Sequence, residues 1–233
     1  MIDQAKKKMV LQSVQEAGLP VGASYLSQKV DLPPATIGRV LAQLEEEELV
    51  TKVSNKGRVL TCKGEHVLRQ EELAEERQKT AGELAEIAAK SDRDSLIEIL
   101  QVRRRLEVYT AEQACLHATE EEIVNLETLV LAHIHEVRAG GLGSDADFEI
   151  HLAIARASRV NTIYQILKLI LSKDNAYTMF SYVSDQLKNA QIKQHDTIIQ
   201  AIRDRDPERA GKEMDSHLLQ IMEDVKRYYE EKQ

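Results

Sequence analysis

The sequence predicts a mostly α-helical protein in two parts: an N-terminal winged helix-turn-helix with a small β-hairpin wing, and a C-terminal antiparallel helical bundle. Three observations support this fold class. Aromatic residues make up only 4% of the 233 residues and charged residues 30%, which is typical of helical proteins. The first 66 residues show a pattern of three helices followed by a hairpin. Beyond residue 93, apolar residues recur at helical spacing without strand-like alternation.

Charge is distributed unevenly between the two parts. The chain carries a formal net charge of −8, yet residues 1–66 hold nine Lys and Arg against eight Asp and Glu. The remaining residues therefore carry a net charge of −9. A near-neutral head on an acidic body is compatible with DNA binding by the head alone.

The sequence also predicts where in the cell the protein is located. No apolar run approaches the ~20 residues of a membrane span, and the N-terminus "MIDQAKKKMVLQ" lacks an apolar core followed by a small-residue cleavage site. Cys62 and Cys115 lack the spacing of a metal knuckle or a redox pair. We expect a cytoplasmic protein with free thiols and no membrane partner.

The head begins with a helix expected over 5–16, which Gly18 and Pro20 end. A short helix around Tyr25 and Leu26 follows, and a longer one starts at Pro33 or Pro34, because proline is tolerated in the first turn of a helix. The segment "LVTKVSNKGRVLT" then predicts two strands joined by Asn55-Lys56-Gly57, since Asn and Gly tolerate positive φ.

This order is that of a winged helix-turn-helix, which inserts its third helix into the major groove of DNA. Thr36 and Arg39 lie off the apolar stripe of that helix, and Lys56 and Arg58 lie on the wing. We expect these four residues to contact double-stranded operator DNA. The acidic block Glu45 to Glu48 is expected to be a solvated helix end. The alternative is a small winged helix used for protein contacts, because a fold does not fix a function.

We place the DNA-binding domain at 1–66, a helical linker at 67–92 and the helical effector, metal-binding and dimerisation domain at 93–233. The linker is dense in Glu, Lys and Arg and is expected to be helical, with a break near Gly82. The helices expected in the body span residues 94–117, 119–138, 145–158, 161–186, 188–205 and 207–231.

The stretch "DADFEIHLAIARAS" places Asp147 and His151 four residues apart in an apolar helical run. Residues at this spacing project from one helix face, so the two side chains could share a metal ion or form an ordinary surface pair. His195 and His217 border apolar stripes on two later helices, which a turn at Asp206-Pro207 joins. The two histidines lie at nearly equal distances from this turn, so they would face each other.

Together these residues predict an N₃O site for a divalent metal ion, namely Zn²⁺, Ni²⁺, Mn²⁺ or Fe²⁺, with Zn²⁺ expected in purified protein. The other histidines are expected to be ordinary surface or linker residues: His66, His117, His133 and His135.

The body resembles the GntR superfamily of bacterial transcription regulators, in the subgroup whose helical C-terminal domain is called FCD. Arg103 and Glu107 occupy the "R-x-x-x-E" positions of the family's opening helix, and "DFEIHLAIARAS" is similar to its "D-x-x-F-H-x-x-I-x-x-A-S". "HDTIIQAIRDRDPERAGKEMDSHL" is similar to its closing motif. The resemblance implies the metal ligands Asp147, His151, His195 and His217.

The resemblance also implies a homodimer that binds a small carboxylate effector at the metal. Arg103 would hold the far end of this effector, and Asn161, one residue later than in the common "ASGN", would contribute to the effector pocket. We therefore expect a ligand-responsive, DNA-binding transcription regulator rather than an enzyme. The alternatives are a regulator that binds an acyl ligand without metal and a metal-dependent hydrolase, because a metal with open positions can activate water.

Overall fold

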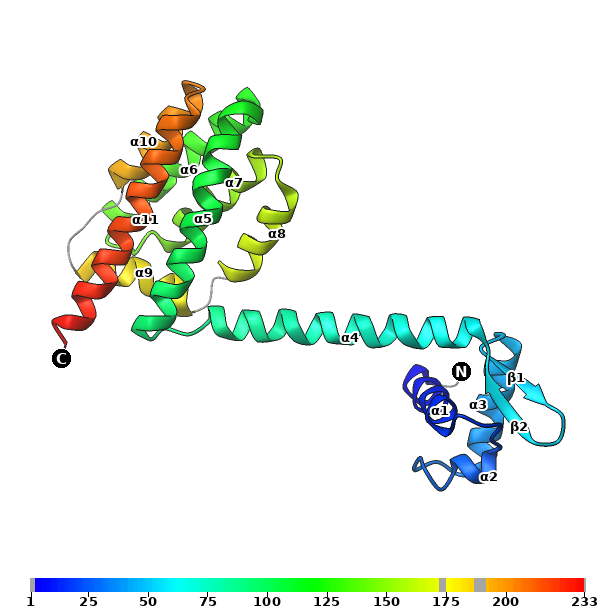
Figure 1. Ribbon diagram of the computed structural model, residues 1–233. Helices are drawn as coiled ribbons and strands as arrows, with labels where there is room; N and C mark the ends of the chain where they lie inside the picture. The colour runs from blue at the N-terminus through cyan, green and yellow to red at the C-terminus, as the bar shows by residue number, and fades with distance from the viewer. Residues whose placement is uncertain (1–2, 172–174, 187–191, 233) are drawn as a thin grey trace. The chain divides into compact units, whose positions relative to one another are not determined.

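The computed structural model describes residues 3–171, 175–186 and 192–232. It confirms the fold class: apart from one two-stranded antiparallel sheet, the regular structure of these residues is helical (Figure 1). The chain forms two compact units, Met1–Thr80 and Ala81–Gln233. None of the described helices combines the length and apolar character needed to span a membrane.

The N-terminal unit contains a winged helix-turn-helix. Its elements are α1 (Gln4–Ala17), α2 (Ala23–Leu26), α3 (Pro34–Glu46), β1 (Val50–Val53) and β2 (Gly57–Leu60). Gly18 ends α1 in the left-handed conformation, with φ of 62°. Pro34 occupies the first turn of α3, where a missing N–H costs nothing. Apolar residues of these helices form one core, which includes Val10, Leu26, Ile37, Val40, Leu41 and Leu44.

The wing is a hairpin in which Val50 pairs with Leu60 and Val53 with Gly57. Val21, in the loop before α2, adds a backbone bridge to Arg58. Gly57 has φ of 127°, and a Cβ atom there would lie 2.5 Å from the carbonyl carbon of Val21. Only glycine fits this close approach between the wing and the helical part of the head.

The linker forms part of α4 (Cys62–Ala88), which is one continuous helix. The break expected near Gly82 is therefore wrong. A glycine inside a helix costs only about 1 kcal/mol relative to alanine, and the helix-favouring residues on both sides outweigh that cost.

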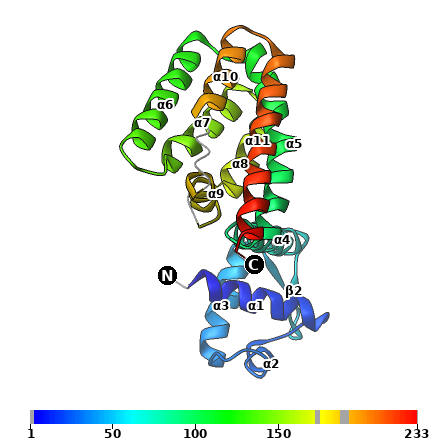
Figure 2. The same cartoon turned by 90° about the vertical axis from the view of Figure 1, so that its left-hand side faces the viewer.

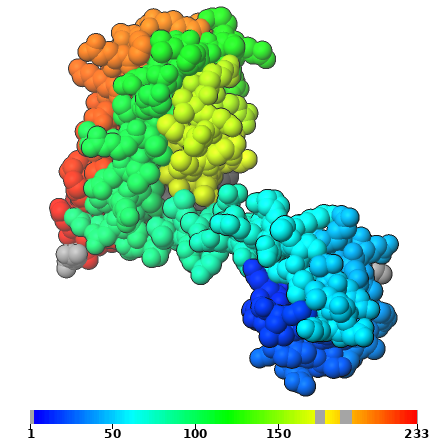
Figure 3. All heavy atoms as spheres, turned by 45° about the vertical axis from the view of Figure 1, so that its right-hand side comes forward, coloured from blue at the N-terminus to red at the C-terminus, as the bar shows by residue number. Residues whose placement is uncertain are grey.

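The second unit is an antiparallel bundle. Its helices are α5 (Arg93–His117), α6 (Glu120–Arg138), α7 (Ser144–Ala157), α8 (Asn161–Ile170), α9 (Asn175–Gln186), α10 (Ile192–Arg203) and α11 (Pro207–Glu230). The two long helices α5 and α11 lie side by side, and α6 packs against α7 and α10 (Figures 1 and 2). The side chains of α8 lie against those of α5 and α7 (Figure 3).

Local signals fix where several of these helices begin. The side chain of Asp92 accepts a hydrogen bond from the backbone of Ser95 at the start of α5. Thr119 and Glu122 form a reciprocal capping box at the start of α6. Asp206 caps α11, whose first residue is Pro207. The predicted turn at Asp206-Pro207 therefore separates α10 from α11, and the helices run antiparallel.

The single helix expected over 161–186 is wrong, because the structure has α8 and α9 there instead. The backbone leaves the helical conformation at the buried Leu171, with φ of −94° and ψ of 29°. The start of the helix expected over 188–205 lies outside the described residues, and α10 is described from Ile192.

Candidate metal centre

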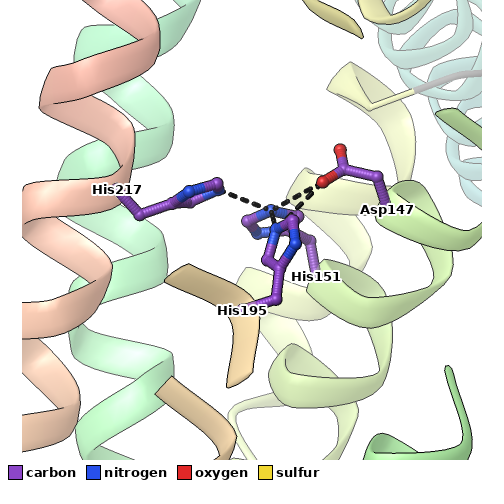
Figure 4. Close-up of side chains that lie close together, drawn as sticks. All are labelled: Asp147, His151, His195 and His217. Carbon is purple, nitrogen blue, oxygen red and sulfur yellow. Dashed lines mark hydrogen bonds and ion pairs between the residues drawn. The ribbon is translucent and has the colours of Figure 1, made fainter. Parts of the chain in front are cut away.

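The bundle brings four predicted residues to one point (Figure 4). Asp147 and His151 lie one turn apart on α7, His195 comes from α10 and His217 from α11. One potential ligand atom from each residue lies within 4.8 Å of those from the other three. The antiparallel turn at Asp206-Pro207 has the predicted effect, because the rings of His195 and His217 have centroids 4.5 Å apart.

The distances between the ligand atoms suit a metal ion. The Nε2 atom of His151 lies 3.4 Å from Nε2 of His195 and 3.2 Å from Nε2 of His217. With metal–nitrogen bonds of about 2.0–2.1 Å, neighbouring ligand atoms lie roughly 2.9–3.4 Å apart. The Oδ1 atom of Asp147 lies 2.9 Å from Nε2 of His195 and 3.8 Å from Nε2 of His151.

These polar side chains are shielded from solvent: the exposed fraction is 6% for Asp147, 1% for His151 and 0% for His195 and His217. Burial of polar groups is costly unless hydrogen bonds or a metal ion compensate for it. A cluster of this kind within an apolar core therefore indicates a binding function rather than a contribution to stability.

Helix α5 places a carboxylate directly behind one of the histidines. The carboxylate of Glu107 accepts a hydrogen bond from Nδ1 of His151 through one oxygen and a 2.6 Å hydrogen bond from Nε of Arg103 through the other. Arg103 and Glu107 are each only 1% exposed. Burial acts to raise the pKa of Glu107, but the interactions with Arg103 and His151 outweigh it and lower the pKa to about 2. Glu107 is therefore ionised.

A second outer contact orients His217. Its Nδ1 atom lies 3.0 Å from Oε1 of Gln194, one residue before His195 on α10. With the Gln194 oxygen as acceptor, His217 carries its proton on Nδ1, and its Nε2 has a lone pair that faces the centre. The carboxylate of Glu107 fixes the same tautomer in His151.

The pKa shifts favour the protonation states that a metal needs. Burial lowers the pKa of His195 despite the attraction of Asp147, and burial together with the neighbouring histidines lowers the pKa of His217 well below its usual value. Burial acts to raise the pKa of Asp147, but the attraction and hydrogen bond of His195 hold it well below its usual value. Neutral imidazoles and an ionised carboxylate are the forms that bind metal.

The prediction that His133 is a surface residue is wrong. It is only 5% exposed, and its ring lies edge-on to that of His195 with centroids 5.1 Å apart. Its Nδ1 atom lies 3.1 Å from the carbonyl oxygen of Gly143, to which it can donate. The helical position of His133 between buried Val130 and the half-buried Ile134 and Val137 was the signal that could have placed it inside.

The two predicted effector residues lie in different surroundings. Arg103 points into the core, where its guanidinium also lies over the ring of Phe180 at 5.5 Å. Asn161 is exposed at the first residue of α8 and lines a surface pocket of about 250 Å³. The other lining residues of this pocket are Ala155, Arg156, Arg159 and Tyr164, so the four candidate ligands are not among them.

The four residues that are predicted to contact DNA differ in their exposure to solvent. Arg39 and Lys56 are exposed and Thr36 is half-buried. Arg58 is half-buried, and its guanidinium pairs with Glu45 at 2.7 Å.

The acidic block is not simply solvated, contrary to expectation. Besides Glu45, Glu47 pairs with Lys7 of α1, and Glu48 pairs with Lys63 of α4. These carboxylates neutralise cations of the head itself and connect the end of α3 to three neighbouring elements.

A winged helix followed by a helical unit that buries three histidines and one aspartate is the architecture that the sequence predicts for a ligand-responsive transcription regulator. The FCD domain family matches residues 98–220, more than half of the chain. The chain therefore belongs to the GntR-family transcription regulators that carry an FCD domain.

Individual relatives agree with this membership. The Uxu operon regulator of Haemophilus influenzae is 26% identical over 129 residues, which cover 53% of this chain and 48% of the relative. The chain thus matches about half the length of this curated relative.

Three solved structures share the fold over nearly the whole chain. Streptococcus agalactiae GntR is 21% identical with a TM-score of 0.50, covering 94% of this chain and 98% of that one. E. coli McbR/YncC is 12% identical with a TM-score of 0.52, covering 98% and 100%. Lar, which controls the expression of the Listeria monocytogenes agr system, is 14% identical with a TM-score of 0.53, covering 97% and 98%.

Proposed function

We propose that this regulator binds a divalent metal ion through Asp147, His151, His195 and His217, and that the ion recruits a small carboxylate effector. The observation that carries the proposal is the 3.2 Å separation between Nε2 of His151 and Nε2 of His217. When each ring donates its Nδ1 proton to Glu107 or Gln194, both of these nitrogens are hydrogen-bond acceptors. Two lone pairs at this distance repel each other unless a cation lies between them.

The donor set restricts the metal. Three imidazole nitrogens and one carboxylate oxygen suit Zn²⁺, Ni²⁺, Mn²⁺ or Fe²⁺, and we expect Zn²⁺ in protein as purified. When bound, such an ion supplies Lewis acidity and coordination positions that an anionic ligand can occupy.

The charges around the centre favour an anionic effector. A divalent cation with Asp147, Glu107 and Arg103 gives the group a net charge of +1, since imidazoles that bind a metal are neutral. A carboxylate would neutralise this charge in a buried place. The same polar surroundings disfavour a long acyl ligand, which needs an apolar pocket. A regulatory role agrees with the family, whereas hydrolysis would need a further group that acts as a base.

We propose that the head binds the half-sites of an operator, with Thr36 and Arg39 of α3 directed at the major groove and Lys56 of the wing at phosphate. We also keep Arg58 among the proposed DNA contacts. Its pairing with Glu45 supports a second role, in which Arg58 holds the wing against α3.

We also propose a homodimer. Val102, Tyr109 and Leu116 recur every seven residues on α5 and are 45%, 45% and 60% exposed. Residues seven apart lie on one helix face, so α5 presents an apolar stripe to solvent. A second copy of the chain would cover this stripe and place two heads on a near-palindromic operator.

Elemental analysis of purified protein tests the metal assignment. We expect about one metal ion per chain in the wild type and a loss of most of it in His195→Ala. His135→Ala, at an exposed histidine of α6, is the matched control and should keep the metal. Full stoichiometric metal in both His195→Ala and His217→Ala would show that the four residues are not the site.

A further inference from the structure

The helix α5 provides none of the four ligands in this cluster, yet it contacts the cluster through Glu107. The carboxylate of Glu107 is 1% exposed and connects two buried groups, the Nδ1 atom of His151 and the Nε atom of Arg103. Gln194 makes the corresponding contact to Nδ1 of His217 over 3.0 Å. Two of the three histidines therefore have an acceptor directly behind them.

Building on the metal site proposed above, we propose that Glu107 and Gln194 are positioning residues that fix the tautomer and orientation of His151 and His217. Each accepts the Nδ1 proton and so keeps the Nε2 lone pair directed at the metal. An imidazole with free rotation about its side-chain bonds and two available tautomers would present this lone pair only part of the time. Figure 4 shows the rings of His195 and His217 directed toward that of His151.

The two positioning residues are not equivalent. Glu107 is a carboxylate that pairs with the guanidinium of Arg103 over 2.6 Å, whereas Gln194 is a neutral amide. A hydrogen bond to a charged acceptor is roughly twice as strong as one between neutral groups, and the negative charge increases the basicity of the liganding nitrogen. We therefore expect His151 to bind the ion more strongly than His217.

His195 completes the contrast. Its Nδ1 atom is buried and has no hydrogen-bond partner among the described residues, while its Nε2 atom lies 2.9 Å from Asp147. The orientation of this ring depends on Asp147 and on packing against His133. A charged acceptor thus orients His151, and a neutral acceptor orients His217. His195 is oriented by its contacts with neighbouring side chains.

Titration with Co²⁺, followed by the visible absorption of the bound ion, tests the two positions. Glu107→Gln removes the charge with little change in shape, and Gln194→Leu removes the acceptor. Loss of such outer contacts typically lowers metal affinity roughly 10- to 100-fold. We expect Glu107→Gln to lose more affinity than Gln194→Leu, and both to change the Co²⁺ spectrum. The controls are Glu98→Gln, exposed on α5, and Gln200→Leu, exposed on α10.

Thermal melting of the metal-free proteins separates positioning from stability. A merely structural role lowers the melting temperature but leaves the Co²⁺ affinity and spectrum of the folded protein unchanged. Because Glu107→Gln leaves Arg103 buried without its partner charge, the double variant Arg103→Met/Glu107→Gln provides a neutral pair if the single variant does not fold. The same loss of Co²⁺ affinity is expected in that background.

Failure of this inference is distinct from failure of the metal site. If the wild type binds no Co²⁺, the proposed metal site is wrong. If the wild type binds it, but the Glu107 and Gln194 variants keep affinities within about twofold of the wild type, the positioning role is wrong. If Gln194→Leu loses as much Co²⁺ affinity as Glu107→Gln, or more, the charged acceptor is not the stronger of the two.

Discussion

The Nε atom of Arg58 on the wing donates a 2.8 Å hydrogen bond to Oε2 of Glu45 near the end of α3. The same residue forms the backbone bridge with Val21. Both contacts hold the wing against the helical part of the head. Arg58 therefore differs from Lys56, whose side chain is exposed in the loop between β1 and β2.

Replacing Lys56 by alanine should weaken binding to any DNA duplex, because a phosphate contact carries no sequence information. Each lost contact lowers the slope of log K against log salt by roughly 0.9. Fluorescence anisotropy with a random-sequence duplex at several salt concentrations measures both effects. Lys168→Ala, on α8 of the other unit, is the control. An unchanged salt slope in Lys56→Ala would refute the assignment of the wing to phosphate.

Replacing Arg58 by alanine should reduce the stability of the head as well as DNA binding. The Arg58–Glu45 pair is partly solvated, with side-chain exposures of 24% and 37%, so we expect a loss of only about 0.2–1 kcal/mol. Glu45→Gln should produce a similar loss without removing a cation from the surface. Denaturant unfolding measures it, and a Glu45→Gln variant as stable as the wild type would show that the pair does not hold the wing.

The metal-free protein should lose stability at mildly acidic pH. The folded-state pKa values of His195 and His217 lie below the usual 6.5, so the unfolded chain binds more protons than the folded one once the pH falls below that value. Stability is therefore lost as the pH decreases through the window below 6.5, by up to about 1.4 kcal/mol per pH unit for each histidine. Asp147 acts in the same direction, but only in the window below its usual value near 4.

Urea unfolding of chelator-treated protein between pH 7.5 and 5 measures this dependence. The variant His195→Gln/His217→Gln removes both groups and should show a flatter profile over the same range. If the variant and the metal-free wild type lose stability equally as the pH falls, the buried histidines are not its source.

A small carboxylate should stabilise only the metal-loaded protein. A ligand that binds the folded state raises its melting temperature by mass action. We therefore expect members of a panel of small mono- and dicarboxylates to shift the melting temperature of the loaded protein, and the shift to disappear after chelation or in His195→Ala. A shift of equal size without metal would contradict recruitment of the effector by the ion.

Introducing a charge into the exposed stripe of α5 should break the dimer. Tyr109→Glu lies in the middle of this stripe, and Val124→Glu, at a 54% exposed position of α6, is the control. Light scattering coupled to size exclusion should report a monomer for the first variant and a dimer for the second. A dimeric Tyr109→Glu protein would place the interface elsewhere.

Local and periodic signals in the sequence were sufficient for much of this structure. The spacing of Asp147 and His151 and the position of the turn between His195 and His217 predicted that these four residues would meet. Contacts between distant helices left no comparable signal. Glu107 lies 44 residues from His151, and no helical period relates the two.

The errors have a similar origin. The polar residues near His133 in the sequence favour a surface position, although the bundle buries this side chain. The pairing of Arg58 with Glu45 joins a strand to a helix 13 residues away, so its geometry depends on how the hairpin folds back. The break after α8 was missed because apolar residues continue on both sides of it.

The spacing of the four side chains along the chain gives the metal a mechanical consequence. His151 and His195 are 44 residues apart, and the intervening chain contains α8 and α9. An ion held by both histidines closes that segment into a loop, as a cross-link would. A covalent link across a loop of this size restricts the unfolded chain by on the order of 4 kcal/mol, which is an upper limit for an exchangeable ion. Metal depletion would therefore lower the free energy of unfolding of the bundle, even where no effector is present.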